Sequence, residues 1–217
     1  MAPSVKLVYF PLRGRAELIR LILEAKGISY QDETIPSEKW GDKKASMPFR
    51  SLPVLYWVGE EIGQSLTIAR SVAKKAGLAG NNDIEQARAD AIVDTVANLP
   101  TKLFEIKNKD ESTKSEAIQA FLNTELSGIL DISENLLKNR GGKFFTGSKL
   151  SYGDIAMFAV IDLLLNPEIM TGFGFGPVLD ELKKLIKDHP LTYGVYKMVK
   201  SQPKIAEYVT KRPKYPF

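Results

Sequence analysis

The chain has 217 residues, 44% of them hydrophobic and 26% charged, with a formal net charge of +4. This composition is ordinary for a globular protein with a proper core, and no apolar run approaches the ~20 residues that span a bilayer. The chain has no cysteine and a single histidine, which excludes disulfides and cysteine metal sites and argues against Ser-His catalysis. If the protein performs thiol chemistry, the thiol must come from its substrate.

The N-terminus runs straight into a strand-like pattern without a signal sequence, and the Lys and Arg residues are dispersed along the chain. These features predict a cytoplasmic protein whose partners include neither nucleic acid nor a membrane.

The first 77 residues alternate between strand-like and helical patterns. Arg13, Glu17, Arg20 and Glu24 recur at helical spacing as a polar stripe on an otherwise apolar segment that ends at Gly27. The expected elements are a strand over 5–10, a helix from 14 to 25, a strand over 30–35, a strand over 53–57, an antiparallel partner ending at 63 and a helix over 64–76. A crossover helix would make the first two strands parallel. This order is that of a thioredoxin-like α/β unit.

Beyond residue 83 the pattern is helical. Residues 77–83 are rich in turn formers and predict a linker. Ser151 and Asp154 have the spacing of a capping box at the start of an apolar helix that runs to Leu165. We therefore expect two domains, an α/β domain over 1–77 and an all-α domain over 84–217.

Three short stretches of the chain fit one site together: residues 9–17, residues 51–55 and the pair Gln64-Ser65. In this order and at these intervals they resemble the glutathione-binding half of the soluble glutathione transferases. The nearest match is the sigma class, which includes the glutathione-dependent prostaglandin D synthases. The resemblance runs from Lys6 to Pro213 and is densest in the first 80 residues. It implies an enzyme that takes glutathione as its co-substrate.

Tyr9 is the candidate catalytic residue. A free thiol titrates near ~8.5, so only a few per cent is thiolate at neutral pH, and a hydrogen-bond donor held against the sulfur lowers that pKa. A tyrosine, with a pKa of about 10, stays protonated and can donate. A tyrosine in a strand is more often a packing residue, but the resemblance gives Tyr9 the thiolate-stabilising role and gives Arg15 electrostatic support of the site.

Two further stretches match glutathione-binding positions. In the family the proline equivalent to Pro53 follows a cis peptide bond, which leaves the backbone of Leu52, next to Ser51, available to pair with the cysteinyl part of glutathione. Gln64 and Ser65 stand at a helix N-terminus, where free N–H groups suit the γ-glutamyl carboxylate. Ser65 taken alone reads as a helix N-cap, and the two roles are compatible.

The resemblance also implies residues for the rest of the ligand pair. Trp40 and Lys44 match positions that close over the glycyl end of glutathione, with the lysine opposing its carboxylate. A small hydrophobic electrophile would bind in a cleft between the two domains. From the family layout, the residues expected to line that cleft are Phe10, Leu12, Arg13 and Tyr152.

One departure from the sigma class bears on partners and cofactors. Where related enzymes carry acidic residues that reach glutathione across a dimer interface, and in the prostaglandin synthases hold a divalent cation, this chain has Ala97-Asn98. Glu105 stands near the position of a wall tryptophan in those synthases. We therefore expect a homodimeric detoxification enzyme without a metal. The alternatives are a non-catalytic relative of the crystallin kind and a glutathione-dependent prostaglandin isomerase.

Overall fold

The computed structural model describes residues 5–215, which form two compact units. One unit comprises residues 5–79 together with 202–215, and the other comprises residues 80–201. The first combines a sheet with helices, and the second consists of helices joined by loops, which confirms the predicted fold class. The predicted all-α range, 84–217, also included the C-terminal helix, which in the structure packs in the first unit.

The first unit is built on a four-stranded mixed sheet. Its strands are β1 (Val5–Tyr9), β2 (Gln31–Thr34), β3 (Val54–Trp57) and β4 (Glu60–Gly63), in the spatial order β2-β1-β3-β4. The β1–β2 pair is parallel, and β3 runs antiparallel to both β1 and β4. All four strands were predicted, with bounds that differ by one or a few residues. A two-residue turn at Val58 and Gly59, both at positive φ, joins β3 to β4, as is usual for a tight hairpin.

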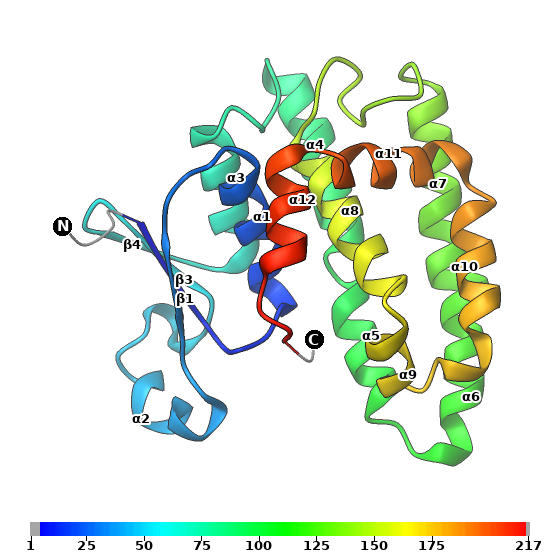
Figure 1. The fold of residues 1–217 in the computed structure, drawn as a ribbon, viewed down its shortest axis with the longest axis horizontal. Coiled ribbons are helices and arrows are strands. Elements are labelled where there is room, and N and C mark those ends of the chain that lie inside the picture. Colours follow the sequence, from blue (N-terminus) through cyan, green and yellow to red (C-terminus); the bar gives the residue numbers. More distant parts are fainter. Residues whose placement is uncertain (1–4, 216–217) are drawn as a thin grey trace. The chain divides into compact units, whose positions relative to one another are not determined.

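Helices cover this sheet. The three longer helices of the unit are α1 (Glu17–Ala25), α3 (Ser65–Lys75) and α12 (Pro203–Lys211). Figure 1 shows α1 and α3 on the same side of the sheet, and α1 packs against both α3 and α12. The apolar positions of α1 and α3 are buried, as their helical periodicity predicts.

Four short helical segments complete the unit. They are η1 (Gly14–Ala16), η2 (Ser37–Lys39), α2 (Trp40–Lys44) and η3 (Pro48–Arg50). The last three lie between the strands expected over 30–35 and 53–57, where the sequence predicted no helix. Segments of three to five residues are too short to carry a repeating apolar face, and their helicity depends on tertiary contacts.

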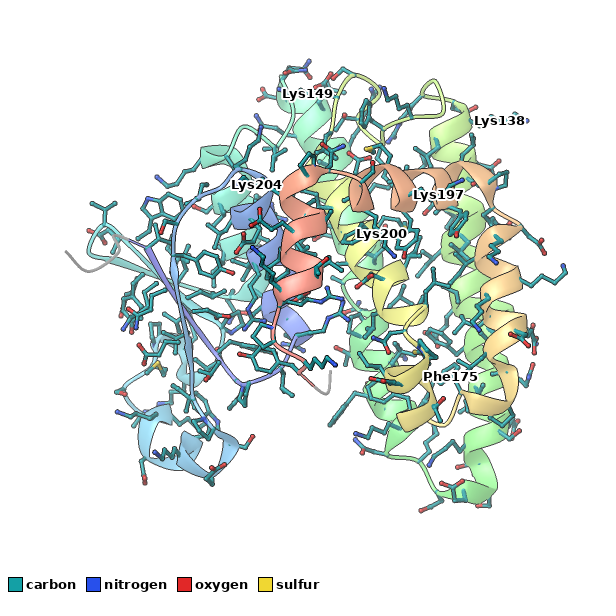
Figure 2. All side chains as sticks on the ribbon, in the orientation of Figure 1. Lys138, Lys149, Phe175, Lys197, Lys200 and Lys204 are labelled. Carbon is teal, nitrogen blue, oxygen red and sulfur yellow. The ribbon has the colours of Figure 1, made fainter. Side chains whose placement is uncertain are left out.

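The second unit consists of helices. They are α4 (Asp83–Val96), α5 (Leu99–Lys107), α6 (Glu111–Ala120), the π-helical η4 (Phe121–Leu126), α7 (Ser127–Lys138), α8 (Tyr152–Leu164), α9 (Pro167–Gly172), η5 (Gly176–Val178), α10 (Leu179–Lys187) and α11 (Pro190–Lys200). Helix α8 is buried on almost every side and packs against α4 and α11. Phe175, between α9 and α10, is fully buried edge-on against Phe121, whereas Lys138 and Lys197 stand on the outer surfaces of α7 and α11 (Figure 2).

The predicted capping box at the start of α8 is present. The Asp154 carboxylate accepts bonds from the Ser151 N–H and hydroxyl, both at 2.7 Å, and from the Phe145 N–H at 2.9 Å. No helix within residues 5–215 combines the length and apolar character needed to cross a membrane.

Candidate functional site

Strand register brings the predicted site segments to one end of the sheet. Val8 pairs with Val54, and Val54 pairs with Gly63. Tyr9 directly follows Val8, Pro53 directly precedes Val54, and Gln64 directly follows Gly63. The tyrosine, the proline segment and the start of α3 therefore meet at the same end of the sheet, although about 55 positions separate the first from the last.

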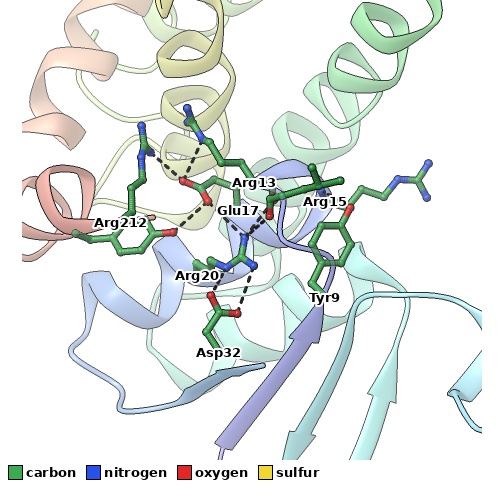
Figure 3. Close-up of polar contacts among 9 residues, drawn as sticks. Tyr9, Arg13, Arg15, Glu17, Arg20, Asp32 and Arg212 are labelled. Atoms are coloured by element: carbon green, nitrogen blue, oxygen red, sulfur yellow. Dashed lines mark hydrogen bonds and ion pairs between the residues drawn. The ribbon is translucent and has the colours of Figure 1, made fainter. Parts of the chain in front are cut away.

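The Tyr9 side chain is held by the turn that joins β1 to α1. Tyr9 is 7% exposed, and its hydroxyl oxygen accepts a hydrogen bond of 3.1 Å from the backbone N–H of Arg15. Among the described residues no acceptor takes the proton of this hydroxyl. Figure 3 shows the hydroxyl at the start of the helical turn, with the exposed Arg15 side chain extending on the same side. An engaged lone pair and an uncommitted proton make this hydroxyl a hydrogen-bond donor.

Burial sets the ionisation of Tyr9. Desolvation raises the pKa of the phenol above its usual value, and the Arg15 N–H and the charges of Arg15 and Arg20 oppose that rise only in part. The phenol therefore remains protonated at neutral pH and can donate without carrying charge itself.

Gly14 allows the turn to approach the phenol. Its φ is +35°, and a Cβ at this position would lie 2.8 Å from the Tyr9 hydroxyl oxygen. Only glycine combines the backbone conformation with that clearance.

The segment that precedes β3 presents the backbone N–H and C=O of Leu52 at this end of the sheet. The Leu52–Pro53 peptide bond is cis, as the resemblance implied, and Pro53 itself is buried. The Leu52 N–H and C=O make no hydrogen bond to any residue between 5 and 215. Ser51 is half-buried and extended. Backbone N–H and C=O groups without a partner can pair with the backbone of an extended peptide.

Gln64 and Ser65 form the entry to α3. Gln64 is exposed and has φ +67° and ψ 113°, a backbone conformation that residues other than glycine rarely adopt. Ser65 begins the helix and is half-buried. A non-glycine residue held in this conformation is often found at binding sites, and the free N–H groups and dipole of an eleven-residue helix suit a carboxylate.

A chain of aromatic rings connects Tyr9 to α2. The Tyr9 and Phe10 rings lie edge-on with centroids 5.6 Å apart, and the Phe10 and Trp40 rings likewise at 5.5 Å. Trp40 begins α2, which places Lys44 on the same short helix with its side chain exposed. The structure thus brings Phe10 and Trp40 to the tyrosine, and Lys44 follows one helical turn away from Trp40.

The remaining predicted residues differ in availability. Leu12 is half-buried in the turn after β1. Arg13 is 5% exposed, and its Nε lies 3.5 Å from the Glu17 carboxylate. Tyr152 in the second unit is fully buried and donates its hydroxyl proton to Asp90. The polar groups of Arg13 and Tyr152 are therefore committed within their own units.

Sequence reasoning missed a cluster of charged residues behind the turn. We call Arg13, Glu17, Arg20, Asp32 and Arg212 the Glu17 cluster (Figure 3). The helical spacing of Arg13, Glu17 and Arg20 is visible in the sequence and predicts a polar face, whereas nothing local marks Asp32 or Arg212. Within residues 5–215 no group of three or more His, Asp or Glu side chains is arranged to hold a metal ion.

Comparison with known proteins gives the family. The profile described as glutathione S-transferase, C-terminal domain, matches residues 97–212. "Probable glutathione S-transferase 6" of Caenorhabditis elegans is 34% identical, and "Hematopoietic prostaglandin D synthase" of Gallus gallus is 32% identical, each over 98% of both chains. The solved sigma-class GST of Fasciola hepatica superposes with a TM-score of 0.81 at 25% identity, covering 99% of each chain.

The profile spans more than half of the chain, and the named relatives align with nearly its whole length. The fold of both units agrees with that of the sigma-class neighbour. This chain is a member of the glutathione S-transferase family.

Proposed function

We propose that this enzyme conjugates glutathione to a small hydrophobic electrophile, with Tyr9 as the catalytic residue. The observation that carries the proposal is the hydrogen bond from the Arg15 N–H to the Tyr9 hydroxyl. It lies at the end of the sheet where Leu52 and Gln64 also lie. The bond occupies a lone pair of the phenol and leaves its proton available for a ligand at that end of the sheet.

The reaction requires no group on the protein to change its covalent bonds. The glutathione thiol loses its proton to solvent, and the Tyr9 hydroxyl donates a hydrogen bond to the resulting thiolate. The sulfur then forms a bond to the electrophilic carbon, and the leaving group departs with the bonding electron pair, or the adduct takes up a proton where there is no leaving group. Because the phenol is protonated, it stabilises the anion in the ground and transition states without consuming a base.

The groups at the same end of the sheet suit the binding of glutathione. The unpaired Leu52 backbone suits the cysteinyl unit of an extended tripeptide, flanked by Ser51 and Pro53. The start of α3, with Gln64 and Ser65, suits the γ-glutamyl carboxylate.

The other end of glutathione and the electrophile use different residues. Trp40 and Lys44 would meet the glycyl carboxylate, for which the exposed ammonium supplies the opposite charge. Phe10 and Leu12 offer half-buried apolar surface beside Tyr9 for the electrophile. Arg13 and Tyr152 are less suited to line that site, because their polar groups already have partners, Glu17 and Asp90.

We also propose that the enzyme works in the cytoplasm as a homodimer without a metal, in detoxification of reactive compounds. A two-fold dimer is the commonest homo-oligomer. Light scattering at micromolar concentration should give twice the mass of 24.1 kDa, and a mass equal to one chain would contradict the dimer.

The test of the proposed mechanism compares wild type, Tyr9→Phe and Tyr56→Phe. Wild type should be retained on immobilised glutathione and conjugate a chlorodinitrobenzene, with a pH–rate midpoint well below that of free glutathione. Tyr9→Phe keeps the ring but loses the donor, so its rate should fall by about 10²-fold or less and its midpoint move toward free thiol. Tyr56 lies at the opposite end of β3, beside Lys6, and its variant should behave as wild type. Identical profiles for wild type and Tyr9→Phe would remove Tyr9 from the mechanism.

The relative named as a prostaglandin D synthase raises isomerase activity as a second candidate. Glu105 is exposed and pairs with Lys102 at 3.7 Å, so a charged surface residue stands where the resemblance led us to look for an aromatic wall. We therefore expect conjugation to exceed isomerisation of a prostaglandin endoperoxide when the two rates are measured on the same preparation.

A further inference from the structure

The Glu17 cluster joins the C-terminal segment to the turn that holds Tyr9. Glu17 is the first residue of α1 and is 5% exposed. One of its carboxylate oxygens accepts a 2.9 Å bond from the Arg212 guanidinium, and the other accepts a 3.1 Å bond from the Tyr208 hydroxyl. Tyr208 belongs to α12, and Arg212 is the residue that directly follows the end of this helix. A buried carboxylate requires such charge-assisted partners, because desolvation without them is costly.

Arg20 is the link between Glu17 and the turn. It is 1% exposed, and its Nε and Nη2 donate to the Asp32 carboxylate at 2.9 and 3.3 Å. Its Nη1 donates to the backbone carbonyls of Leu12 at 2.9 Å and Arg13 at 3.3 Å. These two carbonyls belong to the turn that ends in the Arg15 N–H, the donor to Tyr9.

The same Arg20 nitrogen also lies within reach of Glu17. Nη1 stands 3.7 Å from the Glu17 oxygen that Tyr208 contacts, which is longer than a hydrogen bond. Glu17 and the two turn carbonyls therefore compete for the two N–H groups of one nitrogen. Because Arg212 binds the other oxygen of Glu17, the charge of Glu17 is balanced. Arg20 Nη1 can then donate to the Leu12 and Arg13 carbonyls. Without Arg212, Glu17 keeps Arg13 at 3.5 Å and the Tyr208 hydroxyl, and a closer pair with Arg20 can replace the lost cation.

A ring contact adds to this connection. The Arg20 guanidinium carbon lies 5.6 Å from the centre of the Tyr215 ring and 6.0 Å from that of Tyr9. The cation is thus within cation–π range of both the active-site tyrosine and a residue of the C-terminal segment.

We propose that Arg212 is a positioning residue for Tyr9: by binding Glu17 it keeps Arg20 on the Leu12 and Arg13 carbonyls, which holds the Arg15 N–H against the phenol. This inference rests on the proposed function only for its effect on catalysis, since the geometric part concerns the protein without ligand. Arg212 lies in a different segment of the chain from every residue assigned to glutathione binding.

The geometric part is tested by hydrogen exchange of the Arg15 amide in wild type, Arg212→Met, Arg212→Lys and Lys211→Met. Arg212→Met should speed exchange at Arg15 about tenfold while the Leu7 amide in β1 changes much less. Arg212→Lys should restore part of the protection, because a cation returns. Among residues 5–215 the Lys211 side chain pairs with exposed Glu207 at 2.9 Å and with no other residue, so its variant is the matched control and should leave Arg15 protected. An Arg15 amide that stays as protected as in wild type, or changes only as much as Leu7, overturns the proposal.

The catalytic part is tested by the pH–rate profile of conjugation. Arg212→Met should move the thiolate midpoint part of the way toward that of Tyr9→Phe, with kcat affected more than KM. If Tyr9→Phe shifts the profile and Arg212→Met does not, Arg212 has no positioning role while the proposed function stands. If Tyr9→Phe itself leaves the profile unchanged, the proposed function fails, and the exchange data still decide the geometric claim. Should Arg212→Met not fold, Arg212→Gln, whose amide can donate to Glu17, is judged by the same two outcomes.

Discussion

The backbone N–H of Arg15 donates to the hydroxyl oxygen of Tyr9 at 3.1 Å, from the first helical turn after the strand that ends in the tyrosine. The tyrosine and its donor are six positions apart, so this contact forms within one short segment of the chain. Changes in that segment should therefore disturb the Tyr9 hydroxyl, and the catalysis proposed for it, more than they disturb the fold.

Gly14→Ala should damage catalysis through this segment. A Cβ at residue 14 would lie 2.8 Å from the Tyr9 hydroxyl oxygen, and φ +35° is unfavourable for alanine. We expect kcat/KM to fall by about 10²-fold, which is a typical cost of a misplacement of ~1 Å in an active site. Gly59→Ala is the control, because φ there is +87° but a Cβ would meet nothing within 4 Å. It should lose about 1 kcal/mol of stability and keep its activity. Equal activity of the two variants would show that the phenol tolerates displacement.

Gln64→Gly should weaken glutathione binding without lowering the stability of the fold. The φ of +67° and ψ of 113° cost of order 1–3 kcal/mol for a residue with a side chain, and glycine removes most of that cost while adding about 1 kcal/mol of chain entropy to the unfolded state. We expect a free energy of unfolding equal to or above that of wild type, measured in urea, together with weaker glutathione binding, measured by calorimetry. A variant that binds glutathione as wild type does would mean that the Gln64 amide does not contact the ligand.

Much of the first unit was predictable because its signals are local. Alternating apolar residues predicted β1, and glycine at residues 27, 63 and 77 correctly predicted where elements end. The capping box of Ser151 and Asp154 was predicted for the same reason, since both partners lie within one helical turn.

The Glu17 cluster could not be predicted, because its partners are distant in sequence. Glu17 meets Arg212 only after α12 has packed against α1, and Arg20 meets Asp32 only through the parallel pairing of β1 with β2. In the sequence, the stripe of Arg13, Glu17 and Arg20 has the spacing of a solvated helix face. Burial reverses that interpretation, and burial is a tertiary property.

Alkaline pH should destabilise the protein through its buried tyrosines. Burial, and for Tyr208 the neighbouring Glu17 carboxylate, raises the pKa of Tyr208, and burial likewise raises the pKa of Tyr9 and of Tyr30. An unfolded tyrosine titrates near about 10. Above that pH the unfolded chain releases protons that the folded protein retains, so the stability that is fully present below pH ~10 is lost as the pH rises toward the folded-state pKa values.

The measurement is the free energy of unfolding in urea at several pH values from 8 to 11. Wild type should show a flat region followed by a decline above pH ~10. Tyr208→Phe should be less stable at neutral pH by about 1.5–3 kcal/mol, the cost of a lost hydrogen bond to a charged group. Its decline above pH 10 should be shallower, because one raised tyrosine is gone. A decline of the same steepness in both proteins would exclude Tyr208 as a contributor.

Asp154→Ala should destabilise the helical unit strongly. The fully buried carboxylate accepts bonds from the Phe145 N–H, the Ser151 N–H and the Ser151 hydroxyl. Alanine leaves two backbone N–H groups buried without a partner, at about 1–3 kcal/mol each, and removes the cap of the central helix α8. We expect a total loss of about 3–5 kcal/mol in urea unfolding, with reduced yield of folded protein.

The control for this loss is the exposed cap of α4. Asn82 accepts a 3.0 Å bond from the Glu85 N–H, and Asn82→Ala exposes that N–H to water instead of burying it. It should cost about 1 kcal/mol, the usual value for an N-cap. The difference between the two variants measures what burial adds to an otherwise similar helix cap. Equal losses would mean that water reaches the Phe145 and Ser151 N–H groups once the carboxylate is removed, and that the interior beside α8 opens more easily than its packing indicates.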